Sequence, residues 1–238
     1  MPTTGLCLLP PASGNAPVST KLIAHLSRRY PTQEHVLFHL EHRLFSDTSS
    51  QLPGSDVKQR CFTHVLSFSH DPQHAFVSST KPGNSDESST ITIPAASADS
   101  FTGLISTKLQ PAWYPRQMLS VENGVCVAIE EKGLVVCIGD ARVSARSQGA
   151  GTVRGTVVEL FRREDTGSDE NNYTKEEAAE DEAWMQSALE GLFKGTGVTF
   201  NARIITGRTL PRKPEEGADV EAKRDWNLAK LYMAVFRR

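Results

Sequence analysis

Apolar and polar residues alternate along several stretches of the chain, which is the pattern of half-buried strands. The segments EHVLFHLEHRLF (34–45) and RCFTHVLSFSH (60–70) alternate most clearly, and turn-rich residues separate them. They are predicted to pair in antiparallel fashion across a loose loop. On the first segment, one face is expected to carry Val36, Phe38, Leu40 and Leu44. Shorter strands are predicted at 3–9, at 74–79 and around Ile91 and Ile93.

Three consecutive strands are predicted in the second half of the chain, at about 116–130, 134–145 and 152–163. Gly133 suits a tight hairpin at the first link, and small residues supply the second turn. Strands joined by hairpins, with no helix between them, form an antiparallel meander. One more strand is predicted at GVTFNARII (197–205).

Apolar residues recur at helical spacing in four other segments. Pro17 and Pro31 bracket the first helix, and Pro111 closes a second that begins near Ser97 or Asp99. The third begins at a T-x-x-E capping box, Thr174 with Glu177. The C-terminal DWNLAKLYMAVFRR (225–238) has helical spacing, with a strand as the alternative.

These elements predict an α+β fold in one domain spanning residues 1–238, with a largely antiparallel, barrel-like sheet and two to four packed helices. Polar loops are expected at about 46–58, 81–89, 164–173 and 206–222. The N-terminus has no basic segment followed by a long apolar core, so no signal peptide is expected. No apolar run approaches the roughly 20 residues that cross a bilayer.

A glycine cluster, Gly149-Ala-Gly-Thr-Val-Arg-Gly155, resembles a phosphate-binding loop at first sight. A dinucleotide fingerprint needs a helix after its glycines, and Arg154 stands where the third glycine belongs. The residues that follow are β-branched and predict a strand. The cluster is therefore interpreted as a turn, with a bulge or close packing at Gly155.

Other candidate chemistry is equally weak. His35 and His39 would point the same way on a strand but lie about 13 Å apart, too far to share one zinc ion. The four cysteines show no C-x-x-C pairing, and at least three lie within strand-like apolar patterns, which suits buried, reduced thiols. No nucleophile motif is present, and a metal-dependent triphosphatase barrel would need rows of carboxylates where Glu159 stands alone.

Net charge is −2, so the whole chain has no bias toward nucleic acid. A local cluster could contact phosphate, and its members are Arg142, Arg146, Arg154, Arg162 and Arg163. No aromatic residues interleave with it to stack bases. Direct nucleic-acid binding and a triphosphatase-like barrel enzyme therefore remain as the two alternatives to a non-catalytic protein.

The segment GLVVCIGDARVSARSQGAGTVRGTVVELFRRE (133–164) carries a family resemblance. A hydrophobic run ends in Gly139, a loop of small residues follows, and Arg154-Gly155 opens a strand of the V-x-V-E type. With the short first strand and the acidic-capped third helix, the chain resembles subunit 20 of the Mediator complex, a TATA-binding-related factor of the head module.

The resemblance implies a non-catalytic nuclear protein that needs no cofactor and no metal. Members fold as an antiparallel barrel decorated with helices. They pair with subunit 18, a related barrel, and the C-terminal part of subunit 8 tethers the pair. The assembly relays signals from transcription factors to RNA polymerase II. For this chain, partner contacts are expected at sheet edges and at the C-terminal aromatic residues Trp226, Tyr232 and Phe236, unless these three close the core.

Overall fold

The computed structural model describes residues 3–11, 17–48, 60–81, 84–143, 151–163, 174–209 and 225–237. One sheet contains β1 (Thr3–Leu9), β2 (His35–Asp47), β3 (Phe62–Phe68), β4 (Asp71–Lys81), β5 (Asn84–Pro94), β6 (Trp113–Ile129), β7 (Leu134–Val143), β8 (Thr152–Arg162) and β9 (Ile205–Arg208). The α-helices are α1 (Val18–Arg29), α2 (Ala98–Lys108), α3 (Lys175–Leu192) and α4 (Trp226–Phe236). Single 3₁₀ turns occur at Ala95–Ser97 and Glu130–Lys132.

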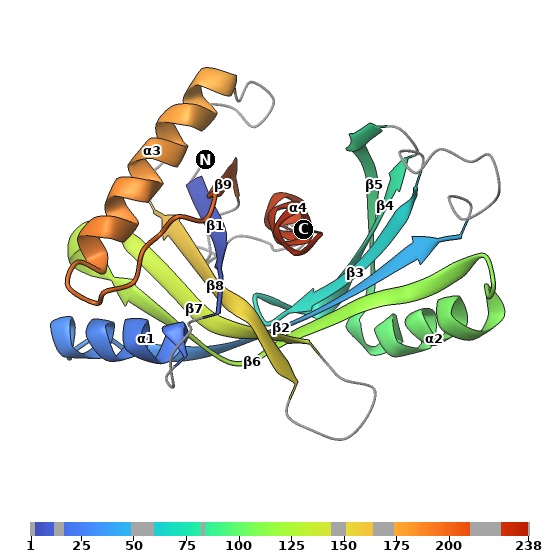
Figure 1. Cartoon of the computed structure of the whole chain (residues 1–238), viewed down its shortest axis with the longest axis horizontal. Coiled ribbons are helices and arrows are strands. Elements are labelled where there is room, and N and C mark those ends of the chain that lie inside the picture. Colours follow the sequence, from blue (N-terminus) through green and yellow to red (C-terminus); the bar gives the residue numbers. More distant parts are fainter. Residues whose placement is uncertain are drawn as a thin grey trace, which may run out of the picture.

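The strand order is β5-β4-β3-β2-β6-β7-β8-β1-β9, and every neighbouring pair is antiparallel. The sheet curls into a half-barrel (Figure 1). Helix α4 lies inside the curve, against β1, β9, β3 and β4. The convex face carries α1 and α3 at one end and α2 at the other. The predicted α+β class with a barrel-like antiparallel sheet is confirmed.

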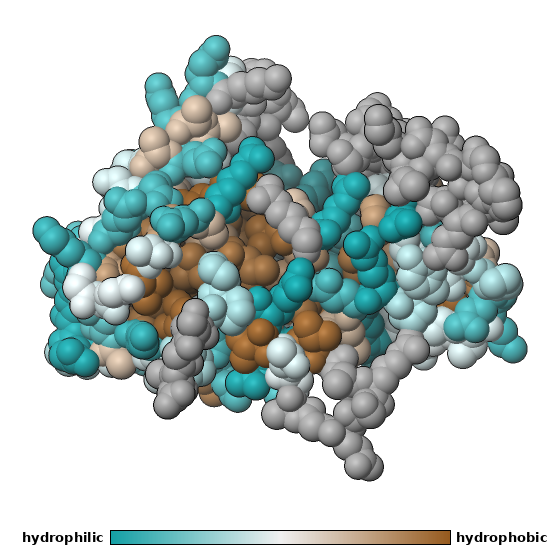
Figure 2. Space-filling model, viewed as in Figure 1, coloured by the Kyte–Doolittle hydropathy of each residue, from teal (hydrophilic) through white to brown (hydrophobic). Residues whose placement is uncertain are grey.

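Each face of the sheet has its own apolar core because successive side chains of a strand point to opposite faces. In β7, Val136 and Ile138 pack toward α1 and α3, whereas Cys137 and Ala141 pack toward α4. A third, smaller cluster lies under α2. Figure 2 shows apolar side chains gathered between α1 and α3 over β7 and β8, with hydrophilic ones around them.

The predicted meander of β6, β7 and β8 is confirmed. Gly133 adopts a left-handed φ of 60° in the turn between β6 and β7. A Cβ on Gly151 would stand 2.1 Å from the carbonyl oxygen of Val143, and one on Gly155 would stand 2.4 Å from that of Leu9. A register shift follows Ala141, which pairs with Gly155, so this glycine marks both close packing and a bulge. Gly149 lies outside the described residues.

The helix predictions are confirmed, and the C-terminal segment forms a helix rather than a strand. Thr174 and Glu177 form the predicted capping box of α3, and Asp225 caps α4 by accepting from the Leu228 N–H. Ser97 precedes α2 without a capping hydrogen bond from its side chain. Among the described residues, no helix is long and apolar enough to cross a membrane.

Four boundary predictions are wrong. The strand predicted at 197–205 begins only at Ile205, because Gly195 and Gly197 turn the chain with positive φ and Phe200 packs into the core. That strand, β9, occupies the start of the loop predicted at 206–222. The loop predicted at 81–89 is β5 from Asn84 onward, since an edge strand takes its stability from main-chain pairing with β4 and tolerates serines. Likewise β2 extends to Asp47, into the loop predicted at 46–58, whereas the loop at 164–173 lies outside the described residues.

Candidate functional site

Helix α4 fills the concave side of the sheet and is buried almost all round. Tyr232 and Phe236 are each 1% exposed, and their rings stack 5.9 Å apart. Trp226 is half-buried and stands edge-on to Phe76. The three residues predicted as partner anchors therefore also pack within the chain. Their role in a partner contact stays a prediction.

A buried carboxylate meets α4 at its centre. The Tyr232 hydroxyl donates to Glu159 Oε2 at 2.6 Å, and Glu159 is fully buried on β8. The Nε2 atom of His70, in the turn between β3 and β4, lies 3.8 Å from the same oxygen. A buried carboxylate is costly unless hydrogen-bonded, so this contact fixes the position of α4 on the sheet.

Two buried histidines lie under the C-terminal end of α4. His42 Nε2 and His64 Nδ1 are 3.0 Å apart, and the His42 ring packs 5.3 Å from Phe236. Burial, with the nearby positive charge of Arg237, lowers the pKa of His64 to about 4. Burial and the neighbouring His64 hold the pKa of His42 well below its usual value. Both rings are neutral at physiological pH, so one donates a hydrogen bond to the other.

The cysteines differ from expectation. Cys126 and Cys137 lie directly opposite each other on β6 and β7 and form a disulfide, so the prediction of reduced thiols is wrong for this pair. The spacing of 11 residues concealed the pairing because only the hairpin register brings the two together. Cys7 and Cys61 form no disulfide, and burial raises the pKa of the Cys7 thiol to about 12.

The histidines and arginines singled out in the sequence do not form a common site. His39 lines a pocket on the convex face, whereas His42 contacts α4 on the concave face. Arg162 lies over the Trp184 ring at 4.5 Å, and Arg163 pairs with Glu130. Arg154 is exposed at the other end of β8, and Arg146 lies outside the described residues. The arginine cluster thus provides no continuous surface among the described residues.

An exposed apolar surface lies at the start of β2. Leu37 is 72% exposed and Val36 is 56% exposed, so Val36 is not buried although it belongs to the alternating apolar positions of this strand. The reason is that β3 begins to pair only at Leu40, so β2 projects past the β3–β4 hairpin. Among the described residues, 35–38 pair with β6 on one side and with no strand on the other.

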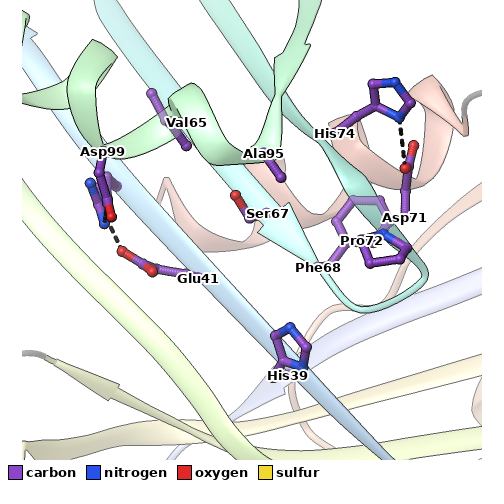
Figure 3. A pocket seen from close by; sticks show the side chains of 12 residues that line it. His39, Glu41, Val65, Ser67, Phe68, Asp71, Pro72, His74, Ala95 and Asp99 are labelled. Carbon is purple, nitrogen blue, oxygen red and sulfur yellow. Dashed lines mark hydrogen bonds and ion pairs between the residues drawn. The ribbon is translucent and has the colours of Figure 1, made fainter.

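A pocket of about 230 Å³ continues this surface along the same face of β2 (Figure 3). His39, Glu41 and Arg43 line it from β2, and Asp71, Pro72 and His74 line it from β4. The guanidinium of Arg43 donates to Glu41, to Asp99 and to Thr102, which ties β2 to α2. His74 pairs with Asp71 at 2.8 Å on the opposite wall. The pocket is thus lined by both charged and apolar side chains, and it lies next to Leu37.

Comparison with protein families gives one match, the family described as the TATA-binding related factor (TRF) of subunit 20 of the Mediator complex, over residues 1–237. The chain belongs to this family. Membership makes it a Mediator subunit and gives it a role in transcription regulation. The resemblance carried by the meander is therefore confirmed.

Similar solved structures include the PH1819 protein of Pyrococcus horikoshii, at 12% identity, covering 83% of this chain and 91% of that one, with a TM-score of 0.42. Another is HpAC1 from Hippeastrum, described as having a dominant triphosphatase activity, at 15% identity, covering 83% and 89%, with a TM-score of 0.41. Comparison with curated proteins found no match.

Sequence reasoning missed the residues that make up these surfaces. Glu159 was recognised only as a lone carboxylate, and His64 drew no attention because its partner is 22 residues away. Leu37 was assigned to the polar face of an alternating strand. A leucine on that face is a signal that could have identified the exposed position.

Proposed function

We propose that the chain is a non-catalytic subunit of the Mediator head module in the nucleus and that it relays regulatory signals to RNA polymerase II through protein contacts. The proposed partners are subunit 18, as a related barrel, and the C-terminal part of subunit 8. The family match over residues 1–237 carries this proposal.

The geometry of the half-barrel supports a non-catalytic role. In a triphosphatase tunnel, carboxylates from several strands face an open interior and hold metal ions. In this chain α4 occupies the concave side, and Glu159 accepts a hydrogen bond from Tyr232 there. The described interior is thus a packed core, which leaves the outer surfaces for contacts.

We place the contact with subunit 18 at the exposed start of β2. The backbone N–H and C=O of His39 both face Ser69 on the β3 side. By strand alternation, the corresponding groups of Leu37 face the same side, where no described strand pairs with them. An extended segment of the partner can add to this edge, bury Leu37 and reach the pocket beyond His39.

Purification of the tagged full chain from nuclear extract, followed by identification of its partners, tests the proposed function. Recovery of subunits 18 and 8 with other head subunits is the expected result. Recovery of the chain with no Mediator subunit would contradict it.

A pair of leucine variants tests the proposed surface. Leu37→Asp should reduce co-purification with subunit 18 at least about tenfold, because burial of an unpaired carboxylate is costly. Leu104→Asp is the matched control, since Leu104 is 50% exposed on α2 and should retain partner binding. Equal retention by the two variants would move the contact elsewhere, for example to Trp226 on α4.

A further inference from the structure

Three side chains that bind soft metal ions meet on the concave face. One ring nitrogen of His70 and the Sγ atoms of Cys126 and Cys137 all lie within 4.8 Å of one another. They come from the turn between β3 and β4, from β6 and from β7. We propose that, when the disulfide is reduced, these three residues bind one Zn²⁺ ion.

The sheet and its aromatic residues hold these donors in place. Cys126 and Cys137 are directly opposite in the β6–β7 register, so both sulfurs project from the same face. The His70 ring lies parallel to the Phe38 ring at 6.3 Å and edge-on to Phe68 at 6.0 Å. Two thiolates and an imidazole form a ligand set that favours zinc over magnesium or calcium.

Glu159 lies beside these donors. It stands opposite Cys137 in the β7–β8 register, with its Oε2 atom 3.8 Å from His70 Nε2. It does not belong to the group of donor atoms within 4.8 Å of one another, so water would complete the coordination of the ion and Glu159 would act beyond the ligands. The Tyr232 hydroxyl already donates to this oxygen and would orient the carboxylate as an outer partner of the metal.

The exchange between the two forms balances in atoms and electrons. Two molecules of a thiol reductant, of the glutathione class, give two electrons and two protons to the disulfide and leave as their own disulfide. Cys126 and Cys137 are then free thiols. Binding of Zn²⁺ as the bis-thiolate releases two protons to solvent. The sulfurs separate to about 3.8 Å, the edge of a tetrahedron with Zn–S bonds of about 2.3 Å.

The bound ion would connect two parts of the half-barrel. His70 belongs to the β3–β4 hairpin, whereas both cysteines belong to the central strands β6 and β7. Tyr232 of α4 contacts Glu159, which lies next to His70. Zinc would therefore clamp the hairpin against β6 and β7 beside α4. This inference is independent of the proposed partners, since it concerns the isolated chain.

Cobalt titration of the full chain tests the proposal. The protein is reduced with a phosphine, freed of metal with a chelator, desalted without oxygen and titrated with Co²⁺ alone. We expect one equivalent to bind with sulfur-to-cobalt charge-transfer absorption, and Zn²⁺ to displace it. The same chain left oxidised should show no such absorption. Its absence from the reduced chain as well would overturn the proposal.

Single variants assign the ligands. Cys126→Ser should abolish or strongly weaken the charge-transfer absorption, whereas Cys61→Ser, at a cysteine outside the cluster, should leave it unchanged. His70→Gln, at a partly exposed turn, should weaken Co²⁺ binding by roughly tenfold or more while leaving the urea denaturation of the metal-free chain close to that of wild type. Unchanged binding in His70→Gln, or loss in Cys61→Ser, would contradict the assignment.

Discussion

The two faces of the sheet are covered by helices in different ways. On the convex face, α1 and α3 each bury one apolar stripe over β1, β7 and β8 and leave their other sides in water. On the concave face, α4 is buried nearly all round and meets polar groups, namely Glu159, His42 and His64. Buried polar contacts also occur on the convex face, where Asp181 on α3 pairs with Arg208. The concave face differs because it buries two histidines whose pKa values are lowered, so its stability depends on pH.

The largest expected effect comes from removing an aromatic ring on each face. Phe236→Ala on α4 and Phe193→Ala after α3 should each lower the free energy of unfolding by about 3–5 kcal/mol, because both side chains are almost fully buried. Urea denaturation measures this loss. Phe236 packs on His42, whose pKa burial holds well below its usual value, whereas Phe193 packs on His25. Phe236→Ala should therefore change the pH dependence of stability more than Phe193→Ala. Equal pH dependence in both variants would contradict the contrast between the faces.

The second-largest expected effect is the destabilisation of the concave face by acid. His64 has a pKa of about 4 in the folded chain against 6.5 for an ordinary histidine. Between these values the unfolded chain binds a proton that the folded chain does not, so stability falls as pH drops from 6.5 to 4 and then levels off. The loss is about 3 kcal/mol from His64, and His42 adds to it.

Urea denaturation at pH 7 and pH 4.5 checks this expectation. Carboxylates elsewhere also contribute to acid loss, so the decisive quantity is the difference between wild type and His64→Gln. The variant should lose less stability on acidification because it removes a group that must charge on unfolding. An identical loss in both proteins would show that the histidine pair plays no part.

The single hydroxyl of Tyr232 should account for a smaller step. Tyr232→Phe removes the donor to Glu159 Oε2 and should cost about 1–3 kcal/mol. Tyr30→Phe on the convex side is the matched control and should stay within about 0.5 kcal/mol. Thermal or urea unfolding of the two variants measures the difference. An equal loss of stability in Tyr30→Phe and Tyr232→Phe would show that the hydrogen bond to Glu159 does not stabilise the fold.

The convex face was the more predictable of the two. Periodicity, with the prolines around α1 and the capping box of α3, located both helices and the strands beneath them, because one apolar stripe on a helix and one apolar face on a strand leave a clear pattern. The concave side required contacts between distant residues. Glu159 and Tyr232 are 73 positions apart, and the Cys126–Cys137 pair depends on hairpin register rather than on a motif.

Predictions from local composition also failed where main-chain pairing between strands decides the structure. The serines of β5 predicted a loop, yet main-chain bonds to β4 hold them as a strand. Val36 belongs to the alternating apolar positions of β2 but is exposed where β3 has ended. Of the surfaces discussed, only the aromatic residues of α4 were anticipated, and the exposed position of Leu37 was not.

The smallest expected effect concerns how two helices of the convex face begin, α3 at one end of the sheet and α2 at the other. The Thr174 hydroxyl accepts a hydrogen bond from the Glu177 N–H at the start of α3, and the Glu177 carboxylate accepts from the Thr174 N–H. Thr174→Ala should therefore lower stability by about 1 kcal/mol. Ser97→Ala before α2 is the matched control, because the Ser97 side chain makes no capping hydrogen bond. This variant should lose no more than a few tenths of a kcal/mol of stability. Urea denaturation of both variants measures the difference. A larger loss of stability in Ser97→Ala than in Thr174→Ala would mean that the capping box does not stabilise α3. The apolar stripe of Met185, Leu189 and Leu192 would then hold that helix alone.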